Sequence, residues 1–413
     1  MSSVISSSFF SRNRAALRNR LPTKAPIVLA ANGQLQRTAD TTFPFAQESN
    51  FFYLTGLEYP DIVLVIDGVE SYVILPPHNH MRDVFDGAFD ISAATKRSGI
   101  TQYYKHRDGW ARLRSSLHGI NEVYTLKPGP SYHTRYSMYL NPSRRRLAQK
   151  LARIAPQVLL HDIRTTLAAL RVIKQPEELA VLQEAIQITS DALASIRTAA
   201  NLKAYKYEFE IEAALTAGFR SRGASGHGFS PIVANGSHAT TIHHVSNDGP
   251  LAADAMTVID IGAEVQHYTA DITRTISAQP LIGRQLAVFH AVQFIAEAAR
   301  EAIKPGITLR ESEEAVERHV GAALVDLGLI ATASDRVAIR RYYPHAASHF
   351  LGLDAHDAGD YSKSLEPGMV LTCEPGIYIP EEGIGVRIED DILVTENGAN
   401  NLSASCSYEP YIL

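Results

Sequence analysis

The sequence has few cysteines, no long apolar run and no excess of basic charge. The two cysteines, Cys373 and Cys406, are predicted to be free thiols, because a chain of 413 residues needs no disulfide and this usage suits a reducing compartment. No apolar run approaches the roughly 18 residues that span a bilayer. With 39 Lys and Arg against 44 Asp and Glu, the net charge is −5, which argues against a nucleic-acid partner. We therefore expect a cytoplasmic protein that binds neither membrane nor nucleic acid.

Acidic residues are absent from the first 39 positions, where Ser and Arg are frequent. Organelle transit peptides share this composition. The segment Arg12–Leu21 is more simply interpreted as a first surface helix. Only Met1–Ser8 is then expected to be dispensable.

The length and the 45% hydrophobic content are those of a folded protein with two domains. Residues 1–170 alternate short apolar strands with helices, which predicts a layered α/β domain. The predicted strands are 27–30, 51–54, 62–66, 72–75 and 158–160, and the predicted helices are 91–98, 110–117 and 143–154.

A second domain, residues 171–413, is predicted to be α+β. Gln175-Pro176-Glu177-Glu178 is typical of a helix start, because proline suits the first turn and acids there face the free N–H groups. Further helices are predicted over 207–220, 283–302 and 309–327. The strand-like runs between these helices carry nearly all the unusual polar residues.

Two strands of this domain carry a carboxylate in an apolar setting. Residues 257–263 contain Asp260, and residues 268–276 contain Asp271. A hairpin that turns at Val265-Gln266 would set the two aspartates opposite each other, where like charges are destabilising. Either a cation lies between them or one of them is protonated.

A second hairpin, turning at Glu381-Glu382, would set Glu374 opposite Glu389 in the same way. One such pair could share a proton, and the acids could also be ordinary exposed strand residues. Two pairs together supply four carboxylates. With one added histidine, they form the oxygen-rich ligand set that suits two divalent cations of the Mn, Fe, Co or Zn type.

Histidines cluster in residues 345–357, where His345, His349 and His356 alternate with small and apolar residues. A second pair, His243-His244, precedes a predicted loop. Either group could be structural or exposed, but three imidazoles within twelve residues favour a site.

Several strings resemble the Xaa-Pro peptidase family, which includes aminopeptidase P and prolidase and has a pita-bread catalytic domain. They occur in the family's order: Ile259-Asp260-Ile261-Gly262-Ala263, Asp271-Ile272-Thr273-Arg274-Thr275, the run Ser348–Asp357, Glu374-Pro375-Gly376-Ile377-Tyr378 and Gly385-Val386-Arg387-Ile388-Glu389-Asp390-Asp391. The segments 37–40 and 43–56 resemble the creatinase-like N-terminal domain of aminopeptidase P.

The resemblance implies a role for each matching residue. The metal ligands would be Asp260, Asp271, His349, Glu374 and Glu389, with Asp271 and Glu389 bridging two ions. The substrate and transition-state residues would be His243, His345 and His356, with Arg387 beside the last ligand and Glu374 as proton shuttle. Tyr378, Asp40 and Phe85 are expected to contact substrate. Phe85-Asp86-Gly87 departs from the family, which has Trp before a Phe-Gly pair, so the substrate wall is expected to differ.

The implied activity is that of an Xaa-Pro aminopeptidase, which removes an N-terminal residue when proline follows, using a hydroxide that bridges two divalent ions. Mn²⁺ is the expected metal, with Co²⁺, Zn²⁺ or Fe²⁺ as alternatives. A homodimer or homotetramer is expected. The nearest alternative is an Xaa-Pro dipeptidase. Methionine aminopeptidase and creatinase-type activity fit less well, because the long N-terminal domain and all five ligands are present. The remaining alternative is a metal-free binding protein on the same fold.

Overall fold

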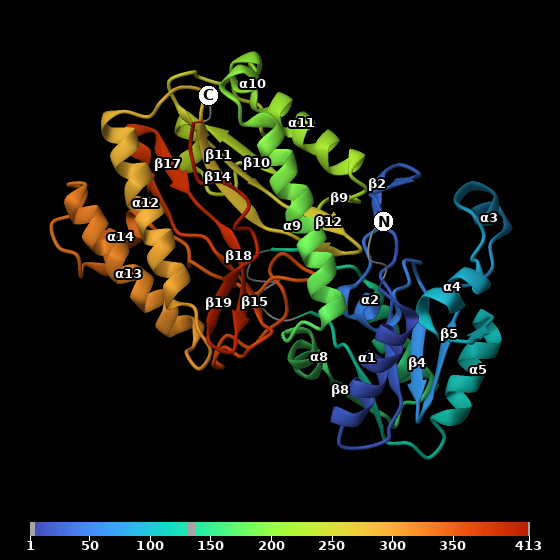
Figure 1. The fold of residues 1–413 in the computed structure, drawn as a ribbon. Coiled ribbons are helices and arrows are strands. Elements are labelled where there is room, and N and C mark those ends of the chain that lie inside the picture. The colour runs from blue at the N-terminus through green and yellow to red at the C-terminus, as the bar shows by residue number, and fades with distance from the viewer. Residues whose placement is uncertain (1–4, 130–136, 412–413) are drawn as a thin grey trace. The chain divides into compact units, whose positions relative to one another are not determined.

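The protein is described from a computed structural model that covers residues 5–129 and 137–411 (Figure 1). The described residues form two compact units, and the boundary between the units lies at Arg171 and Val172.

The N-terminal unit is built on one six-stranded sheet in the order β6-β5-β4-β1-β7-β8. Its strands are β1 (Ile27–Ala30), β4 (Val63–Asp67), β5 (Glu70–Ile74), β6 (Gln102–Tyr104), β7 (Glu122–Thr125) and β8 (Leu159–Asp162). Strand β4 is antiparallel to both of its neighbours, whereas the β5–β6, β1–β7 and β7–β8 pairs are parallel. This confirms the predicted α/β layering.

Helices accompany the sheet of the N-terminal unit. They are α1 (Ser7–Arg20), α2 (Ser49–Thr55), α3 (His80–Asp86), α4 (Ile91–Ser98), α5 (His106–Ser116), α7 (Ser143–Ile154) and α8 (Arg164–Arg171). Leucines of α5 and α7, such as Leu113 and Leu147, share one buried cluster with Val28 and Val65 of the sheet. Helices α4 and α7 have the predicted bounds.

Two predictions for this unit are wrong. Residues 51–54 form helix α2 and not a strand, because Glu48 caps its first turn by accepting a hydrogen bond from Phe51 N at 2.8 Å and Gly56 ends it at a φ of 65°. These local caps outweigh the strand propensity of the aromatic residues. The segment up to Ser8 is not wholly dispensable, since Ile5 is buried and α1 already begins at Ser7.

The C-terminal unit combines two groups of helices with short antiparallel sheets, as the α+β prediction requires. Its helices are α9 (Pro176–Ile196), α10 (Ala199–Ala204), α11 (Glu208–Ser221), α12 (Gly283–Ala302), α13 (Leu309–Asp326) and α14 (Arg336–Tyr342). The predicted start at Gln175 is confirmed: Pro176 is the first helical residue, and Glu178 accepts a hydrogen bond from Gln175 N. The pair α9–α11 packs against one set of strands and the pair α12–α13 lies side by side near another (Figure 1).

The strands divide between these two helix pairs. The set near α9 and α11 is β9 (Gly226–His227), β10 (Ile232–Asn235), β11 (Met256–Ile261), β12 (Ala263–Val265), β13 (Tyr268–Thr269) and β14 (Ile272–Ser277). The set near α12 is β15 (Val370–Cys373), β16 (Gly376–Ile379), β17 (Ile384–Arg387), β18 (Asp390–Thr395) and β19 (Gly398–Asn401). Two 3₁₀ turns, η1 (Gly236–Thr240) and η2 (Pro380–Glu382), link strands.

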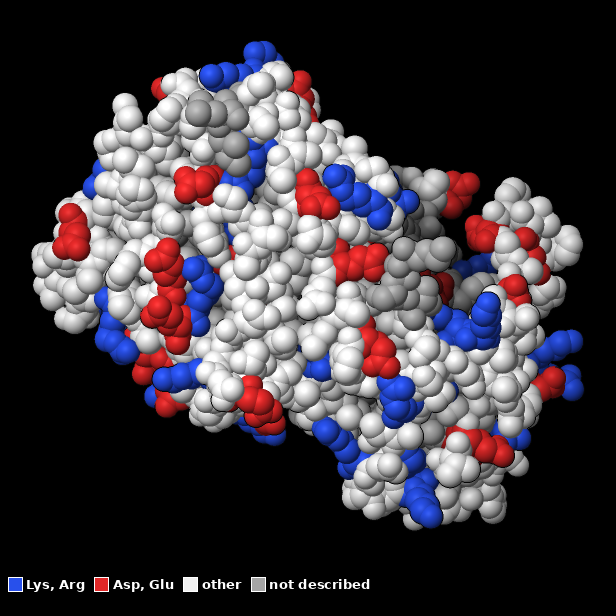
Figure 2. Space-filling view, in the orientation of Figure 1, with Lys and Arg blue, Asp and Glu red and all other residues white. Residues whose placement is uncertain are grey.

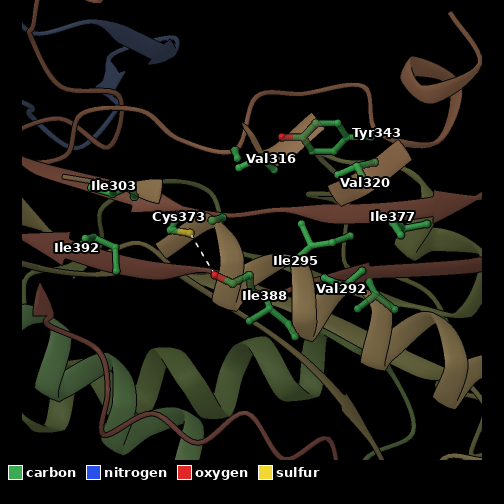
Figure 3. Close-up of a cluster of buried hydrophobic side chains, with 14 of the residues drawn as sticks. Val292, Ile295, Ile303, Val316, Val320, Tyr343, Cys373, Ile377, Ile388 and Ile392 are labelled. Atoms are coloured by element: carbon green, nitrogen blue, oxygen red, sulfur yellow. Dashed lines mark hydrogen bonds between the residues drawn. The ribbon is translucent and has the colours of Figure 1, made fainter. Parts of the chain in front are cut away.

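A large apolar core separates α12 and α13 from strands β15–β18 (Figure 3). Cys373 and Ile388 contribute to it, and the Cys373 thiol donates to Ala296 O at 3.9 Å. Because side chains alternate along an extended chain, the next residues, Glu374 and Glu389, face the opposite side. One face of these strands therefore packs on the apolar core, and the opposite face carries Glu374 and Glu389. Both cysteines are free and buried, as predicted.

Acidic and basic side chains are interspersed over the face seen in Figure 2. Among the described residues, no helix is both long enough and apolar enough to cross a membrane.

Candidate metal centre

The first predicted hairpin exists, but the predicted register is wrong, because the turn lies one residue further along the chain than expected. The turn lies at Gln266-His267, flanked by the pair Val265 and Tyr268, and Asp260 lies opposite Thr273. Both turn residues have positive φ, 47° and 67°, the combination of a type I′ turn, which matches the twist of a hairpin.

Asp260 and Asp271 are still close neighbours on this hairpin. Continuing the observed register sets Asp271 opposite Gly262, two residues from Asp260 and so on the same face. Gly262 is required there, because a Cβ would lie 1.7 Å from Ala270 O across the hairpin. The interaction of the two carboxylates is among the causes that raise the pKa of Asp271.

The second predicted register is confirmed. Cys373 pairs with Asp390 and Gly376 pairs with Arg387, and these rungs enclose Glu374 and Glu389 in the predicted register. The two hairpins meet where Glu389 N donates to Thr273 O at 3.1 Å. This contact brings the two acidic pairs together.

His349 joins the acids from a segment that pairs with β15. Thr372 N donates to His349 O at 2.9 Å, and Leu351 N donates to Val370 O at 3.0 Å. The His349 side chain then lies with Nε2 at 3.3 Å from Glu374 Oε1 and 3.6 Å from Asp271 Oδ2. Ligand atoms of Asp271, His349 and Glu389 all lie within 4.8 Å of one another. The structure thus brings together all five residues that the resemblance implied as ligands.

The carboxylates of this cluster resist ionisation when no cation is beside them. Burial raises the pKa of Glu374 to about 8, with a further contribution from Asp260. Burial, followed by the charges of neighbouring acids, also raises the pKa values of Asp271 and Glu389 well above their ordinary range. Burial lowers the pKa of His349 to about 4, so that its imidazole is neutral near pH 7.

The tautomer of His349 provides a test of whether a cation fits. Nδ1 lies 3.1 Å from Phe350 O, which can only accept, so Nδ1 carries the proton and Nε2 carries a lone pair. That lone pair faces the oxygens of Asp271 and Glu374, which are also acceptors once these carboxylates are ionised. Asp260 Oδ1 is also buried, with no hydrogen-bond partner among the described residues. A divalent cation would satisfy all of these groups, so the donor set fits the expected metals.

Arg387 supplies positive charge at the edge of the cluster. Its Nη2 donates to Asp260 Oδ2 at 2.7 Å, its Nη1 to the Tyr378 hydroxyl at 2.9 Å and its Nε to Thr273 Oγ1 at 3.0 Å. Thr273 in turn donates to Glu389 Oε2 at 2.6 Å. The sequence did not identify Thr273 as a site residue, because a hydroxyl in an apolar strand carries no distinctive pattern.

Asp391 is a second residue that the sequence did not single out. It is fully buried, and its Oδ2 accepts a hydrogen bond from Asp271 N at 3.2 Å. It therefore fixes the backbone of Asp271. The doubled acid at 390–391 was the only signal that could have indicated it.

The three predicted substrate histidines lie at the border of this cluster. The His356 ring lies 4.2 Å from the His349 ring, and His345 Nε2 lies 2.8 Å from the Tyr378 hydroxyl. Burial lowers the pKa of His345 to about 4 and also lowers the pKa of His356, and an electrostatic interaction with His243 contributes to both shifts. His243 and His356 are exposed, so they can reach a molecule outside the protein.

Asp40 and Phe85 belong to the N-terminal unit. Asp40 lies in the turn between β2 (Gln36–Thr38) and β3 (Thr41–Thr42), and Phe85 lies on α3 with 77% of its surface exposed. A role for either residue in substrate binding stays a prediction.

Comparison with known proteins agrees with this geometry. Residues 180–396 match the model of metallopeptidase family M24, and residues 10–124 match the aminopeptidase P N-terminal domain. The Xaa-Pro aminopeptidase of Escherichia coli K12 is 32% identical over 99% of this chain and 97% of its own length. The low-pH structure of E. coli aminopeptidase P superposes with a TM-score of 0.88 at 29% identity, over 98% of this chain and 97% of that one. A zinc-substituted form of that enzyme in complex with product gives a TM-score of 0.87 at 28% identity, with the same coverage. The chain therefore belongs to metallopeptidase family M24, among its Xaa-Pro aminopeptidases.

Proposed function

We propose that this chain is a metal-dependent Xaa-Pro aminopeptidase, which hydrolyses the bond between the first residue of a peptide and a proline in the second position. The observation that carries the metal dependence is the His349 lone pair, which faces two carboxylates. The names of the relatives support the substrate class and do not favour the dipeptidase alternative.

The proposed ligands are Asp260, Asp271, His349, Glu374 and Glu389, with Asp271 and Glu389 shared between two ions. Two divalent cations held there would polarise a carbonyl oxygen and lower the pKa of a water molecule. Arg387 and Thr273 hold Asp260 and Glu389 in place, so the ligands are oriented before substrate arrives.

The histidines suit a bond that precedes proline. An Xaa-Pro bond is a tertiary amide without an N–H, so a peptidase that pairs with substrate as a β-strand loses a hydrogen bond there. The exposed side chains of His243 and His356 can contact the substrate without a hydrogen bond from the proline nitrogen. A hydrogen bond from either ring would stabilise the developing oxyanion by roughly 3 kcal/mol where water is excluded.

Glu374 is the proposed proton carrier. Its Oε2 lies 3.7 Å from His345 Nδ1. Once a cation keeps this carboxylate ionised, it can take a proton from the attacking water and return it to the leaving proline nitrogen.

The test is hydrolysis of an Xaa-Pro-Yaa tripeptide by the whole chain after chelation and after addition of Mn²⁺. We expect activity to be lost with the chelator and restored by the metal. No hydrolysis by the metal-supplemented chain would overturn the proposal. Asp271→Asn should be inactive with Mn²⁺, whereas Asp254→Asn, a change to an exposed aspartate outside the cluster, should retain activity.

The same assay separates the two peptidase activities. An aminopeptidase cleaves the tripeptide and longer peptides, whereas a dipeptidase prefers the Xaa-Pro dipeptide. Manganese as the native metal, assembly into homodimers or homotetramers, the cytoplasmic location and the substrate contacts of Asp40, Phe85 and Tyr378 remain part of this proposal. Metal analysis of the protein as purified and its mass in solution test the first two.

A further inference from the structure

A second group of ionisable residues in the C-terminal unit centres on Glu208. Glu208 lies in the first turn of α11, and its side chain is completely buried. Oε1 accepts hydrogen bonds from Asn235 N at 2.8 Å and His238 Nδ1 at 3.0 Å, and Oε2 accepts from His244 Nε2 at 2.9 Å and Gly249 N at 2.8 Å. A carboxylate with four donors is fully satisfied.

The four donors enclose one stretch of chain, residues 235–249, which contains η1 and the segment with His243. Helix α11 holds this stretch at a further point, since Glu212 accepts from Asn247 Nδ2 at 2.8 Å and Asn247 Oδ1 accepts from Val233 N. After Thr240 the stretch is a loop, and no helix or strand follows until β11 begins at Met256. Helix α11 therefore holds this stretch on both sides of His243.

The other side of this stretch leads to the metal cluster. η1 packs against β17 so closely that a Cβ on Gly385 would lie 2.1 Å from Ala239 O. Strand β17 ends at Arg387, the partner of Asp260. Glu208 and strand β17, which carries Arg387, thus both contact this short segment.

We propose that Glu208 is a positioning residue for the reaction: its buried carboxylate fixes residues 235–249 through four hydrogen bonds and thereby fixes the position of His243 within that stretch. We call Glu208, the side-chain donors His238 and His244, and the backbone N–H groups of Asn235 and Gly249 the clamp. The proposal deepens the proposed function and rests on it, since His243 acts only if the chain is a peptidase.

Glu208, His238 and His244 are also close enough together to hold a metal ion. The hydrogen bonds favour the clamp, because each carboxylate oxygen already accepts one backbone N–H and one imidazole nitrogen. A metal ion would have to displace both imidazole bonds. No buried side-chain nitrogen or oxygen of these three residues lacks a hydrogen-bond partner, in contrast to Asp260 Oδ1.

The test compares Glu208→Gln with Glu210→Gln in the metal-loaded enzyme. A carboxamide places an NH₂ group against two of the four donors, so we expect kcat to fall by about 10²-fold, the usual cost of misplacing a catalytic group, with a smaller change in KM. Glu210 is half-buried on the same turn, and its variant should retain kcat, because the amide oxygen of glutamine can still accept the hydrogen bonds from Lys206 N and Tyr207 N. Wild-type kcat in Glu208→Gln would overturn the proposal.

A double-variant comparison distinguishes positioning from general stability. If Glu208 acts through His243, adding Glu208→Gln to His243→Ala should cause little further loss of kcat. An equal further loss in that background would overturn the proposal. A wild-type enzyme that cleaves no Xaa-Pro substrate would instead reject the proposed function, so the two failures are distinguishable.

Two further measurements test whether a loss of kcat comes from misfolding of the variant or from loss of a metal ion bound by these residues. If Glu208→Gln does not fold, His244→Leu removes one donor, and His244→Gln, which keeps a donor near the position of Nε2, should recover most of the kcat lost by the leucine variant. Metal content should be the same in wild type and His244→Leu. One ion fewer per chain in the variant would identify a metal site and overturn the clamp.

Discussion

Arg387 donates a hydrogen bond from Nη2 to Asp260 Oδ2 at 2.7 Å, and the arginine is almost entirely buried. The same guanidinium reaches Tyr378 and Thr273, so that each of its three nitrogens has a partner. An isolated buried charge is costly, and here one cation offsets part of the excess of carboxylates. The arginine thus links the acidic cluster to the tyrosine beside His345.

Arg387→Lys should impair both stability and activity. A lysine keeps the charge but cannot replace three directed hydrogen bonds. We expect the free energy of unfolding to fall by about 3 kcal/mol, the cost of breaking a buried ion pair, measured by urea denaturation with Mn²⁺ present. Arg284→Lys is the control, because Arg284 pairs with Glu382 at the surface and should lose less than about 1 kcal/mol.

Divalent metal should raise the melting temperature of the wild-type protein and not that of Asp271→Asn. An ion that binds only the folded state stabilises it by about 2.7 kcal/mol at a hundredfold excess over Kd. The variant lacks one of the two ligands that we propose to be shared between the ions, so Mn²⁺ should produce little shift. Thermal melts with chelator and with Mn²⁺ measure this. Equal shifts in the two proteins would show that the metal binds elsewhere.

The chelated protein should lose stability as the pH rises from about 5 toward 8. Folding raises the pKa of Glu374 from its usual 4.5 to about 8, so the folded state holds a proton that the unfolded chain has released. The stabilisation is complete below pH 4.5 and is lost as the pH approaches 8. Melting temperatures in chelator across this range should show the decline, and it should be shallower in Glu374→Gln. Glu366→Gln, at an exposed position, should leave the slope unchanged.

Thr273→Val should weaken metal binding with little change in shape. The Thr273 hydroxyl donates to Glu389 Oε2 at 2.6 Å and accepts from Arg387 Nε, and valine removes both contacts. Losing a partner that orients a ligand typically costs roughly 10-fold to 100-fold in metal affinity, measurable by titration of the chelated protein. Thr189→Val is a matched control: Thr189 is equally buried, and its hydroxyl contacts only backbone at Ala185 and Ala263. An unchanged affinity in Thr273→Val would argue against a role in orienting Glu389.

Local sequence signals predicted the ends of several helices. Helices α4, α7 and α12 have their predicted bounds, and α9 begins at the predicted proline. The signals were misread at α2, where Glu48 and Gly56 act as caps on an aromatic run that has strand propensity. Caps act on backbone groups directly, so they prevailed over side-chain preference.

The sequence by itself determined the second hairpin register and the face on which each acid lies, because the period of two in a strand is a local property. Only the tertiary structure decided which turn closes the first hairpin, where His349 lies, and that Thr273, Asp391 and Glu208 support the site. The positions of His349, Thr273, Asp391 and Glu208 depend on contacts between segments that lie apart in the chain. Such contacts follow from packing around a shared core, and no periodicity in the sequence records them.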